Sequence, residues 1–327
     1  MKAVVVERYG PPEVAVVAEE SMPEPGLGEV LVRVDAAAVT SGDARMRAAS
    51  FPPGFGFLAR LGIGIRGPRR RVLGVAFSGR VERASSDVAE FSPGDEVAGM
   101  TGARLGAHAE YVAVPSSRLA PKPRAVSPED AAGILFGGST ALWFLRDRAH
   151  VRPGDRVLVN GASGSVGSAA VQLARHFGAS VTAVTSAANT QLVLGLGAER
   201  AIDYRETPVA AIPDHFDVVF DAVGNLSRAE GLPLLAPGGR LILAVAGLAD
   251  TAIPHRGVIT GTAPERAEDF ELLLGLLASG ELRGTTQALD GLESVAAAYR
   301  LIDSGRKVGN IVVRPRLTGH TGAGSWG

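Results

Sequence analysis

The chain has 327 residues, which is too long for one compact core and predicts two domains. Its formal net charge of −1 gives no reason to expect a nucleic acid or an anionic membrane as a partner. The lack of cysteine excludes disulfides, catalytic thiols and every cysteine-based zinc site. No stretch approaches the roughly 18 apolar residues that span a bilayer. The apolar run before Glu7 is too short for a signal peptide, so we expect a cytoplasmic protein.

Residues 1 to about 115 are predicted to form many short β-strands. Val-rich segments alternate with Gly/Pro turns such as Pro11-Pro12 and Pro93-Gly94. The predicted strands are 2–6, 14–18, 30–36, 72–76, 79–82, 96–98 and 109–114. This pattern is typical of a partly open barrel or a sandwich.

Residues 50–71 interrupt this pattern, because Gly, Pro and Phe mix with five arginines. The apolar residues here follow neither the helical nor the strand period. The segment is predicted to be a long loop. In one interpretation it is a flap over a substrate pocket, lined by Phe51, Phe55 and Phe57, with arginines that attract a carboxylate or phosphate. The alternative, which we favour for the arginines, is a solvated basic loop.

A helix is predicted to begin after Ser127, which precedes Pro128 and two acidic residues. The Gly-Gly-Ser-Thr segment at 137–140 predicts a break, after which the helix resumes over 141–149. A turn at 152–155 then leads into a short buried strand over 156–159.

The segment from 157 to 167 reads VLVNGASGSVG and is followed by a predicted helix over 168–177. The three glycines of this segment have positions with different requirements. The strand must turn tightly, a phosphate must approach the backbone, and the helix must pack on the sheet; the glycines are Gly161, Gly164 and Gly167. Further strands are predicted at 180–185, 201–202, 216–220 and 239–245, with a helix at 189–196. Strands that alternate with helices favour a doubly wound parallel sheet with a dinucleotide site.

Two amphipathic helices are predicted over 264–279 and 292–304, and a last strand over 308–313 returns to the first domain. The tail from Arg316 is rich in Gly, Ser and Thr and is predicted to be disordered.

Several segments in one order resemble the medium-chain dehydrogenase/reductase superfamily, in its zinc-independent, quinone oxidoreductase-like branch. They read LGVAFSGRVE, FSPGDEVAG, GAHAEYVAVP, GGSTA and RPGDRVLVNGASGSVGSAAVQLARHFGA. The resemblance implies an α/β protein with a GroES-like β-rich barrel domain at 1–122 and 260–315, a Rossmann domain at 123–259 and a tail at 316–327. It also implies a cofactor in the cleft between the domains. A homodimer that pairs edge strands near 241–245 is a further implication.

The resemblance implies no catalytic zinc. The positions that match the zinc ligands of other relatives are Thr40, Val75 and the region of Phe136 and Gly137, and none is a credible ligand. The six histidines are scattered without the spacing of a metal site.

The cofactor is predicted to be NADPH. An NAD enzyme places an acidic residue after the second strand to hold the ribose diol, whereas this chain has Thr185 to Asn189 without Asp or Glu. Because no carboxylate repels it here, the additional phosphate that distinguishes NADPH from NADH fits beside Ser186. Tyr204 resembles the family tyrosine near this phosphate, and Arg205 follows it.

Other cofactor contacts follow from position in the resemblance. The turn would bind pyrophosphate through backbone N–H groups, and Thr140 resembles the threonine beside the nicotinamide ribose. The ends of the fourth and fifth strands would border the cofactor. Lys307 and Asn310 would meet it from the returning segment, or would only close the barrel. The turn residues are Ser163, Gly164, Ser165 and Val166, and the strand-end residues are Ala222, Val223, Ala246, Gly247 and Leu248.

Thr40 and Asp43 occupy the stretch that, by resemblance, faces the nicotinamide. Thr40 is a candidate hydrogen-bond donor to an enolate or alkoxide. Asp43 is a candidate for orienting water or the carboxamide of the nicotinamide. Alternatively, Asp43 caps a helix that starts at Ala44. His108 is a further candidate proton donor, with packing as the alternative role.

These features predict an NADPH-dependent reductase of a quinone or an activated C=C bond. One alternative is an NADP-dependent alcohol dehydrogenase or carbonyl reductase, which would need a replacement for metal polarisation of the carbonyl. The other is a protein that binds the dinucleotide without catalysis.

Overall fold

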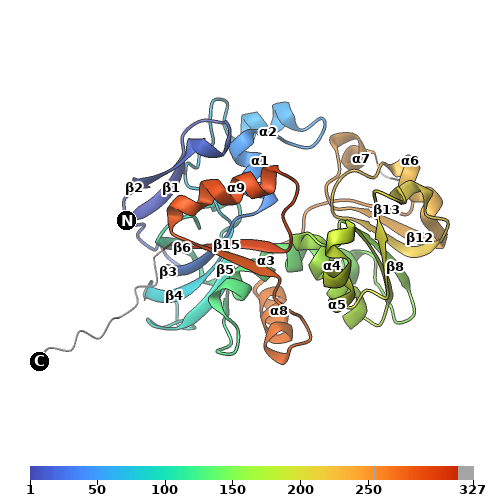
Figure 1. Cartoon of the computed structure of the whole chain (residues 1–327). Coiled ribbons are helices and arrows are strands. Elements are labelled where there is room, and N and C mark those ends of the chain that lie inside the picture. The colour runs from blue at the N-terminus through green and yellow to red at the C-terminus, as the bar shows by residue number, and fades with distance from the viewer. Residues whose placement is uncertain (254, 316–327) are drawn as a thin grey trace, which may run out of the picture.

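The structure is a computed structural model that describes residues 1–253 and 255–315. It has two large β-sheets and a two-stranded one (Figure 1), and a cleft lies between the two large sheets. The predicted tail at 316–327 lies outside the described residues. No helix in the described ranges is both long and apolar enough to cross a membrane. The predicted domain boundaries near 122 and 260 stay a prediction.

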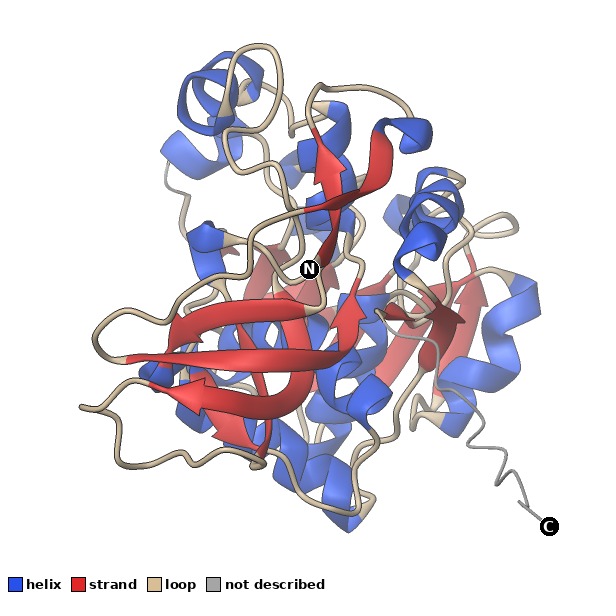
Figure 2. Cartoon of the chain, turned by 90° about the vertical axis from the view of Figure 1, so that its left-hand side faces the viewer, coloured by secondary structure: helices blue, strands red, loops and turns tan. Residues whose placement is uncertain are grey.

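Five strands of the N-terminal part and the last two strands of the chain form a barrel-like, seven-stranded sheet that lies in front in Figure 2. Its order is β14-β15-β3-β4-β5-β7, and β6 pairs with β3. The strands are β3 (Glu29–Ala38), β4 (Ala76–Ala84), β5 (Glu96–Met100), β6 (Tyr111–Pro115), β7 (Leu119–Pro121), β14 (Thr286–Asp290) and β15 (Asn310–Arg314). A hairpin of β1 (Lys2–Val6) and β2 (Ala15–Glu19) lies beside it. The predicted return of the last strand is confirmed, because β15 pairs antiparallel with β3.

The two strands predicted at 72–76 and 79–82 are wrong, because one strand, β4, runs from Ala76 to Ala84. Gly79 does not turn the chain. A Cβ at this position would lie 2.9 Å from the carbonyl carbon of Arg33 on the neighbouring strand. The glycine therefore permits a close approach of two strands.

The second sheet has six parallel strands in the order β10-β9-β8-β11-β12-β13, which confirms the doubly wound prediction. The strands are β8 (Arg156–Asn160), β9 (Ser180–Thr185), β10 (Arg200–Asp203), β11 (Phe216–Asp221), β12 (Leu235–Leu243) and β13 (Val258–Ile259). The prediction that 241–245 is an edge strand is wrong, because β13 pairs with β12 and takes the edge.

Alternation along β8 supplies apolar side chains to both faces of this sheet. Val157 and Val159 join one buried cluster, whereas Leu158 joins another. The first cluster continues through α3 (Pro128–Leu142) into β3, β4 and β5, so one core connects the two sheets. The remaining helices are α1 (Ser41–Ala48), α2 (Gly56–Ile63), α4 (Ser165–His176), α5 (Thr190–Gly195), α6 (Arg228–Gly231), α7 (Leu248–Ala252), α8 (Ala267–Ser279) and α9 (Val295–Asp303).

The break predicted at 137–140 is wrong, because α3 passes through these residues without interruption. A Cβ on Gly137 would lie 2.5 Å from Ser165 Oγ, and one on Gly138 would lie 3.0 Å from Leu273. The glycines let α4 and α8 pack closely against α3. A π-helical turn, Trp143–Arg148, then continues the helix in place of the predicted 141–149 segment.

The prediction of a structureless loop over 50–71 is also wrong, because α2 occupies its centre. The two glycines within α2 mask its helical period in the sequence. Phe57 is 74% exposed, and none of Phe51, Phe55 and Phe57 lines the cleft. The flap interpretation for these phenylalanines is therefore not supported.

Candidate functional site

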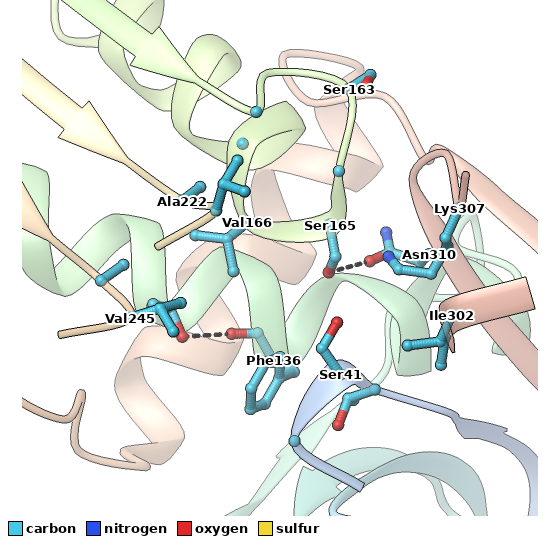
Figure 3. A pocket seen from close by; sticks show the side chains of 18 of the residues that line it. Ser41, Phe136, Ser163, Ser165, Val166, Ala222, Val245, Ile302, Lys307 and Asn310 are labelled. Atoms are coloured by element: carbon cyan, nitrogen blue, oxygen red, sulfur yellow. Dashed lines mark hydrogen bonds between the residues drawn. The ribbon is translucent and has the colours of Figure 1, made fainter. Parts of the chain in front are cut away.

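A cavity of about 920 Å³ lies between the two sheets, at the carboxyl ends of β8, β9 and β11. Figure 3 shows side chains from both halves of the chain pointing into it: Ser41 and Phe136 from one side, Ser165 and Val166 from another. Ligands of open parallel sheets bind at this edge.

The glycine turn forms one wall of the cavity. Gly161 has a φ of 77°, which favours glycine, and a Cβ on Gly167 would lie 2.8 Å from the carbonyl carbon of Gly161. The N-cap of α4, Gly164, has no side chain to satisfy the first turn. Gly164 forms a parallel bridge with Gly309, whereas the N–H of Val166 has no acceptor in the described structure. An anion fits this free helix N-terminus.

The returning segment forms the facing wall and is tied to the turn. Gly309 N–H donates to Ser163 O at 2.8 Å, and Ser165 Oγ donates to Asn310 Oδ1 (Figure 3). Lys307 also lines the cavity, and its ammonium donates to Gly309 O. Burial lowers the pKa of Lys307 to about 8. Lys307 and Asn310 are therefore both placed against the phosphate turn.

The far end of the cavity, beyond β9, is polar and carries positive charge. Asn189 Nδ2 donates to Ser163 Oγ and to Ser186 Oγ, each at 3.2 Å. Tyr204 lines the same end at 47% exposure, and the guanidinium of Arg205 lies 5.9 Å from its ring centre. The lining here contains no Asp or Glu.

Asp203, at the end of β10, is the nearby acid. Its carboxylate accepts from the backbone N–H groups of Ala187 and Arg205 at 3.0 and 2.9 Å. Asp203 does not line the cavity.

Only two of the five predicted strand-end residues line the cavity. Ala222 and Val223 line it, but Ala246, Gly247 and Leu248 do not. The chain leaves the sheet at Leu243, earlier than predicted. Consequently Ala244 and Val245 reach the cavity instead, and the N–H of Leu248 donates to Pro53 O.

At the remaining end, the lining comes from α1, α3 and the loop after β13. Thr140 Oγ1 donates to Phe136 O at 2.8 Å, and both residues line the cavity. Ser139, beside Thr140, also lines it. Its hydroxyl is buried and has no hydrogen-bond partner in the described structure. The sequence does not single out Ser139, because an unpartnered hydroxyl has no local sequence signal.

Thr40 lines the cavity, but its hydroxyl is already engaged. Thr40 Oγ1 donates to Asp43 Oδ2 at 2.6 Å and accepts from Asp43 N–H at 3.2 Å. Asp43 is fully buried, does not line the cavity, and also accepts from Gly74 N–H at 3.2 Å. The structure therefore favours a capping role of Asp43 over direct contact with a ligand, but the predicted helix start at Ala44 is wrong. The helix α1 begins at Ser41, Thr40 is its N-cap, and Asp43 completes the capping box. The structure also leaves Thr40 without a free proton for an oxyanion.

His108 packs inside the barrel. It is fully buried, its Nε2 lies 3.0 Å from Ala38 O, and its ring meets the edge of Tyr299. It does not line the cavity. This placement favours the packing role over proton donation.

Comparisons with known proteins agree with this architecture. The alcohol dehydrogenase GroES-like domain family matches residues 26–124, and the zinc-binding dehydrogenase family matches residues 196–313. A 2-methylene-furan-3-one reductase from Solanum lycopersicum is 31% identical, over 96% of this chain and 79% of that protein. An NADPH-dependent alkenal/one oxidoreductase from Arabidopsis thaliana is also 31% identical, over 96% and 80%.

Among solved structures, the quinone oxidoreductase from Coxiella burnetii superposes with a TM-score of 0.86 at 28% identity, over 97% of this chain and 99% of that chain. This chain belongs to the quinone oxidoreductase branch of the medium-chain dehydrogenase/reductase family. The Escherichia coli quinone oxidoreductase in complex with NADPH shares the fold, with a TM-score of 0.81 at 23% identity over 96% and 100%.

The donor set at the metal position of zinc-using family members does not fit zinc in this chain. Thr40 is bonded to Asp43, and Val75 is an apolar side chain in the core. Within residues 1–253 and 255–315, no three His, Cys, Asp or Glu side chains gather as a metal site requires.

Proposed function

We propose that this chain is a zinc-independent, NADPH-dependent reductase of a quinone or of an α,β-unsaturated carbonyl compound. The observation that carries the proposal is the cavity, which combines a free helix N–H group with an acid-free, positively charged end beyond β9. The names of the relatives, which include alkenal/one and quinone oxidoreductases, support the same chemistry.

The residues present fit NADPH. The turn at 163–166 would bind the pyrophosphate, with the unbonded N–H of Val166 as a donor and with Lys307 and Asn310 closing over it. Ser186, Tyr204 and Arg205 would surround the additional phosphate of the adenosine. Ala222, Val223 and Val245 would border the dinucleotide from the strand ends. When bound, NADPH supplies a hydride and both electrons for the reduction.

The protein must also stabilise the oxygen that gains negative charge in the substrate. Thr40 was the predicted donor, but its proton points to Asp43. Ser139 lines the cavity, and its hydroxyl is buried beside it without a hydrogen-bond partner in the described structure. We therefore propose Ser139 as the donor to the substrate oxygen, with Thr140 beside the nicotinamide ribose.

Replacing Ser139 by alanine is expected to lower kcat about tenfold and to leave the affinity for NADPH unchanged, because a single neutral hydrogen bond to the developing oxyanion is lost. The matched control is Ser78→Ala, since Ser78 is the other buried serine whose hydroxyl has no partner in the described structure, and it lies away from the cavity. Steady-state kinetics with an enone would measure both variants. An unchanged kcat in Ser139→Ala would remove Ser139 from the mechanism.

The affinity for NADPH is expected to fall as pH rises above 8. Burial sets the pKa of Lys307 near 8 in the free protein, and bound phosphate favours its charged form. Affinity is therefore constant below pH 8 and falls by up to about tenfold per pH unit above it. Fluorescence titration from pH 7 to 9.5 would measure the dissociation constant. Lys307→Met should remove the dependence, whereas Lys307→Arg should hold the affinity to higher pH; equal slopes in all three proteins would contradict the role.

The test of the proposed function is NADPH oxidation by the purified protein after dialysis against a chelator, with a quinone, an enone and a simple ketone offered separately. We expect oxidation with the quinone or the enone. Reduction of the ketone alone would favour the alcohol dehydrogenase or carbonyl reductase alternative. Tight NADPH binding without turnover would favour the non-catalytic alternative, and activity lost with the metal would contradict a zinc-independent reaction.

We also propose a cytoplasmic homodimer without a nucleic-acid or membrane partner. The net charge of −1 supports the lack of polyanionic partners. The outer edge of β13 pairs with no strand in the described chain, and such an edge accepts a second copy. Light scattering coupled to gel filtration would give the mass in solution.

A further inference from the structure

The cavity contains one charged side chain that the cofactor does not explain. Its lining includes four cationic residues, Arg45, Arg205, Arg306 and Lys307, and one acidic residue, Glu265. Arg205 lies beyond β9, and Arg306 and Lys307 lie on the returning segment beside the phosphate turn. The phosphates of NADPH account for these three. Arg45 comes from α1, on the barrel side of the cleft.

The helix α1 presents Arg45 to the substrate end of the cavity. Ser41, Gly42 and Arg45 line the cavity from one face of this helix, whereas Asp43, Ala44 and Arg47 are buried on the other. A Cβ on Gly42 would lie 3.8 Å from Phe136 Cζ, so this face of α1 packs beside Phe136. Arg45 stands one turn further along the same face.

Arg45 has no anionic partner in the described structure. No carboxylate lies within ion-pair distance of its guanidinium, and no acceptor bonds to it. Glu265 is engaged elsewhere, because Arg118 Nη1 donates to its carboxylate at 2.6 Å. Burial lowers the pKa of Arg45, yet an arginine stays charged at neutral pH. A partly buried, unpaired cation is costly unless a ligand supplies its counter-ion.

We propose that Arg45 binds a carboxylate on the substrate, so that the preferred substrates are quinones or enones that carry an acidic side group. This inference rests on the proposed reductase function and names its substrate class. One guanidinium balances one negative charge and pairs with a carboxylate through two parallel N–H···O bonds. Ser139 then meets the carbonyl oxygen while Arg45 fixes the remote end of the molecule.

The experiment uses an enone with a carboxylate two methylenes away from its C=C bond, and the methyl ester of the same compound. The two substrates share the reacting group, and the ester lacks the negative charge. We expect Arg45→Gln to lower kcat/KM for the acid at least about tenfold and to change that for the ester less than about twofold. Arg45→Lys should retain part of the preference, because it keeps the charge and loses the paired geometry.

The matched control is Arg66→Gln, which removes an exposed arginine outside the cavity and should affect neither substrate. NADPH affinity is measured for every variant by fluorescence. Equal losses for acid and ester, or weaker NADPH binding in Arg45→Gln, would overturn the proposal, and the second result would assign Arg45 to the cofactor.

Calorimetry with the saturated acid and the NADPH-loaded protein tests the same contact without turnover. Binding that Arg45→Gln weakens at least about tenfold supports the proposal even if neither enone is reduced, in which case the proposed reductase activity alone fails. Binding that is equal in both proteins overturns the role of Arg45 whatever the activity.

Discussion

Gly167→Ala is expected to raise the dissociation constant for NADPH about 100-fold or more. The added Cβ would lie 2.8 Å from the carbonyl carbon of Gly161 and 2.9 Å from Ala162 Cα, and both are backbone atoms that cannot move aside alone. Either α4 or the turn must shift, which displaces the N–H group of Val166 from the pyrophosphate. A misplacement of about 1 Å in a binding constellation costs on the order of 100-fold.

The control for this variant is Gly275→Ala in the middle of α8, where no neighbouring atom lies within 4 Å of the added Cβ. This change should leave NADPH binding intact and, if anything, stabilise the fold by up to about 1 kcal/mol. Thermal unfolding of both variants separates a local defect from a global one, since overpacking at Gly167 costs about 1 to 3 kcal/mol. Wild-type NADPH affinity in folded Gly167→Ala would mean that the turn does not hold the cofactor.

The sequence predicted the parallel sheet and its phosphate turn because their signals are local. Strand, glycine turn and helix follow one another within 156–176. The misread glycines show the limit of this reasoning. Gly79 and Gly137 look like chain breaks in the sequence, but each lies opposite a neighbour from a distant segment. Only the fold reveals whether a glycine serves a turn or a close approach.

The candidate site was predictable on the cofactor side and less so on the substrate side. The predicted residues of the phosphate turn, Ser186 and Tyr204 all line the cavity, because the strand ends fix their positions. Asp43 was assigned a possible role in orienting water or the carboxamide because its partner Gly74, 31 residues away, is invisible in the local pattern. Ser139 and Arg45 stand out for their lack of partners, which no sequence pattern encodes.

Ser186→Asp is expected to reverse the cofactor preference from NADPH to NADH. Ser186 follows β9 and lines the acid-free end of the cavity, where the additional phosphate of NADPH is proposed to lie. Two like charges about 4 Å apart near a protein surface repel by about 4 kcal/mol, which corresponds to a loss of roughly 100- to 1,000-fold for NADPH. For NADH the new carboxylate accepts hydrogen bonds from the ribose diol, so its kcat/KM should rise.

The selectivity ratio, kcat/KM with NADPH over kcat/KM with NADH, is the decisive measurement. It should fall by at least about 100-fold in Ser186→Asp. Gln191→Glu is the matched control, because it adds the same charge on the exposed side of α5, outside the cavity, and should leave the ratio within about twofold. A ratio near one in the wild-type protein would contradict the NADPH preference itself. A high ratio that survives in Ser186→Asp would instead place the phosphate nearer Tyr204 and Arg205, where Tyr204→Ala and Arg205→Ala would then have to lower it.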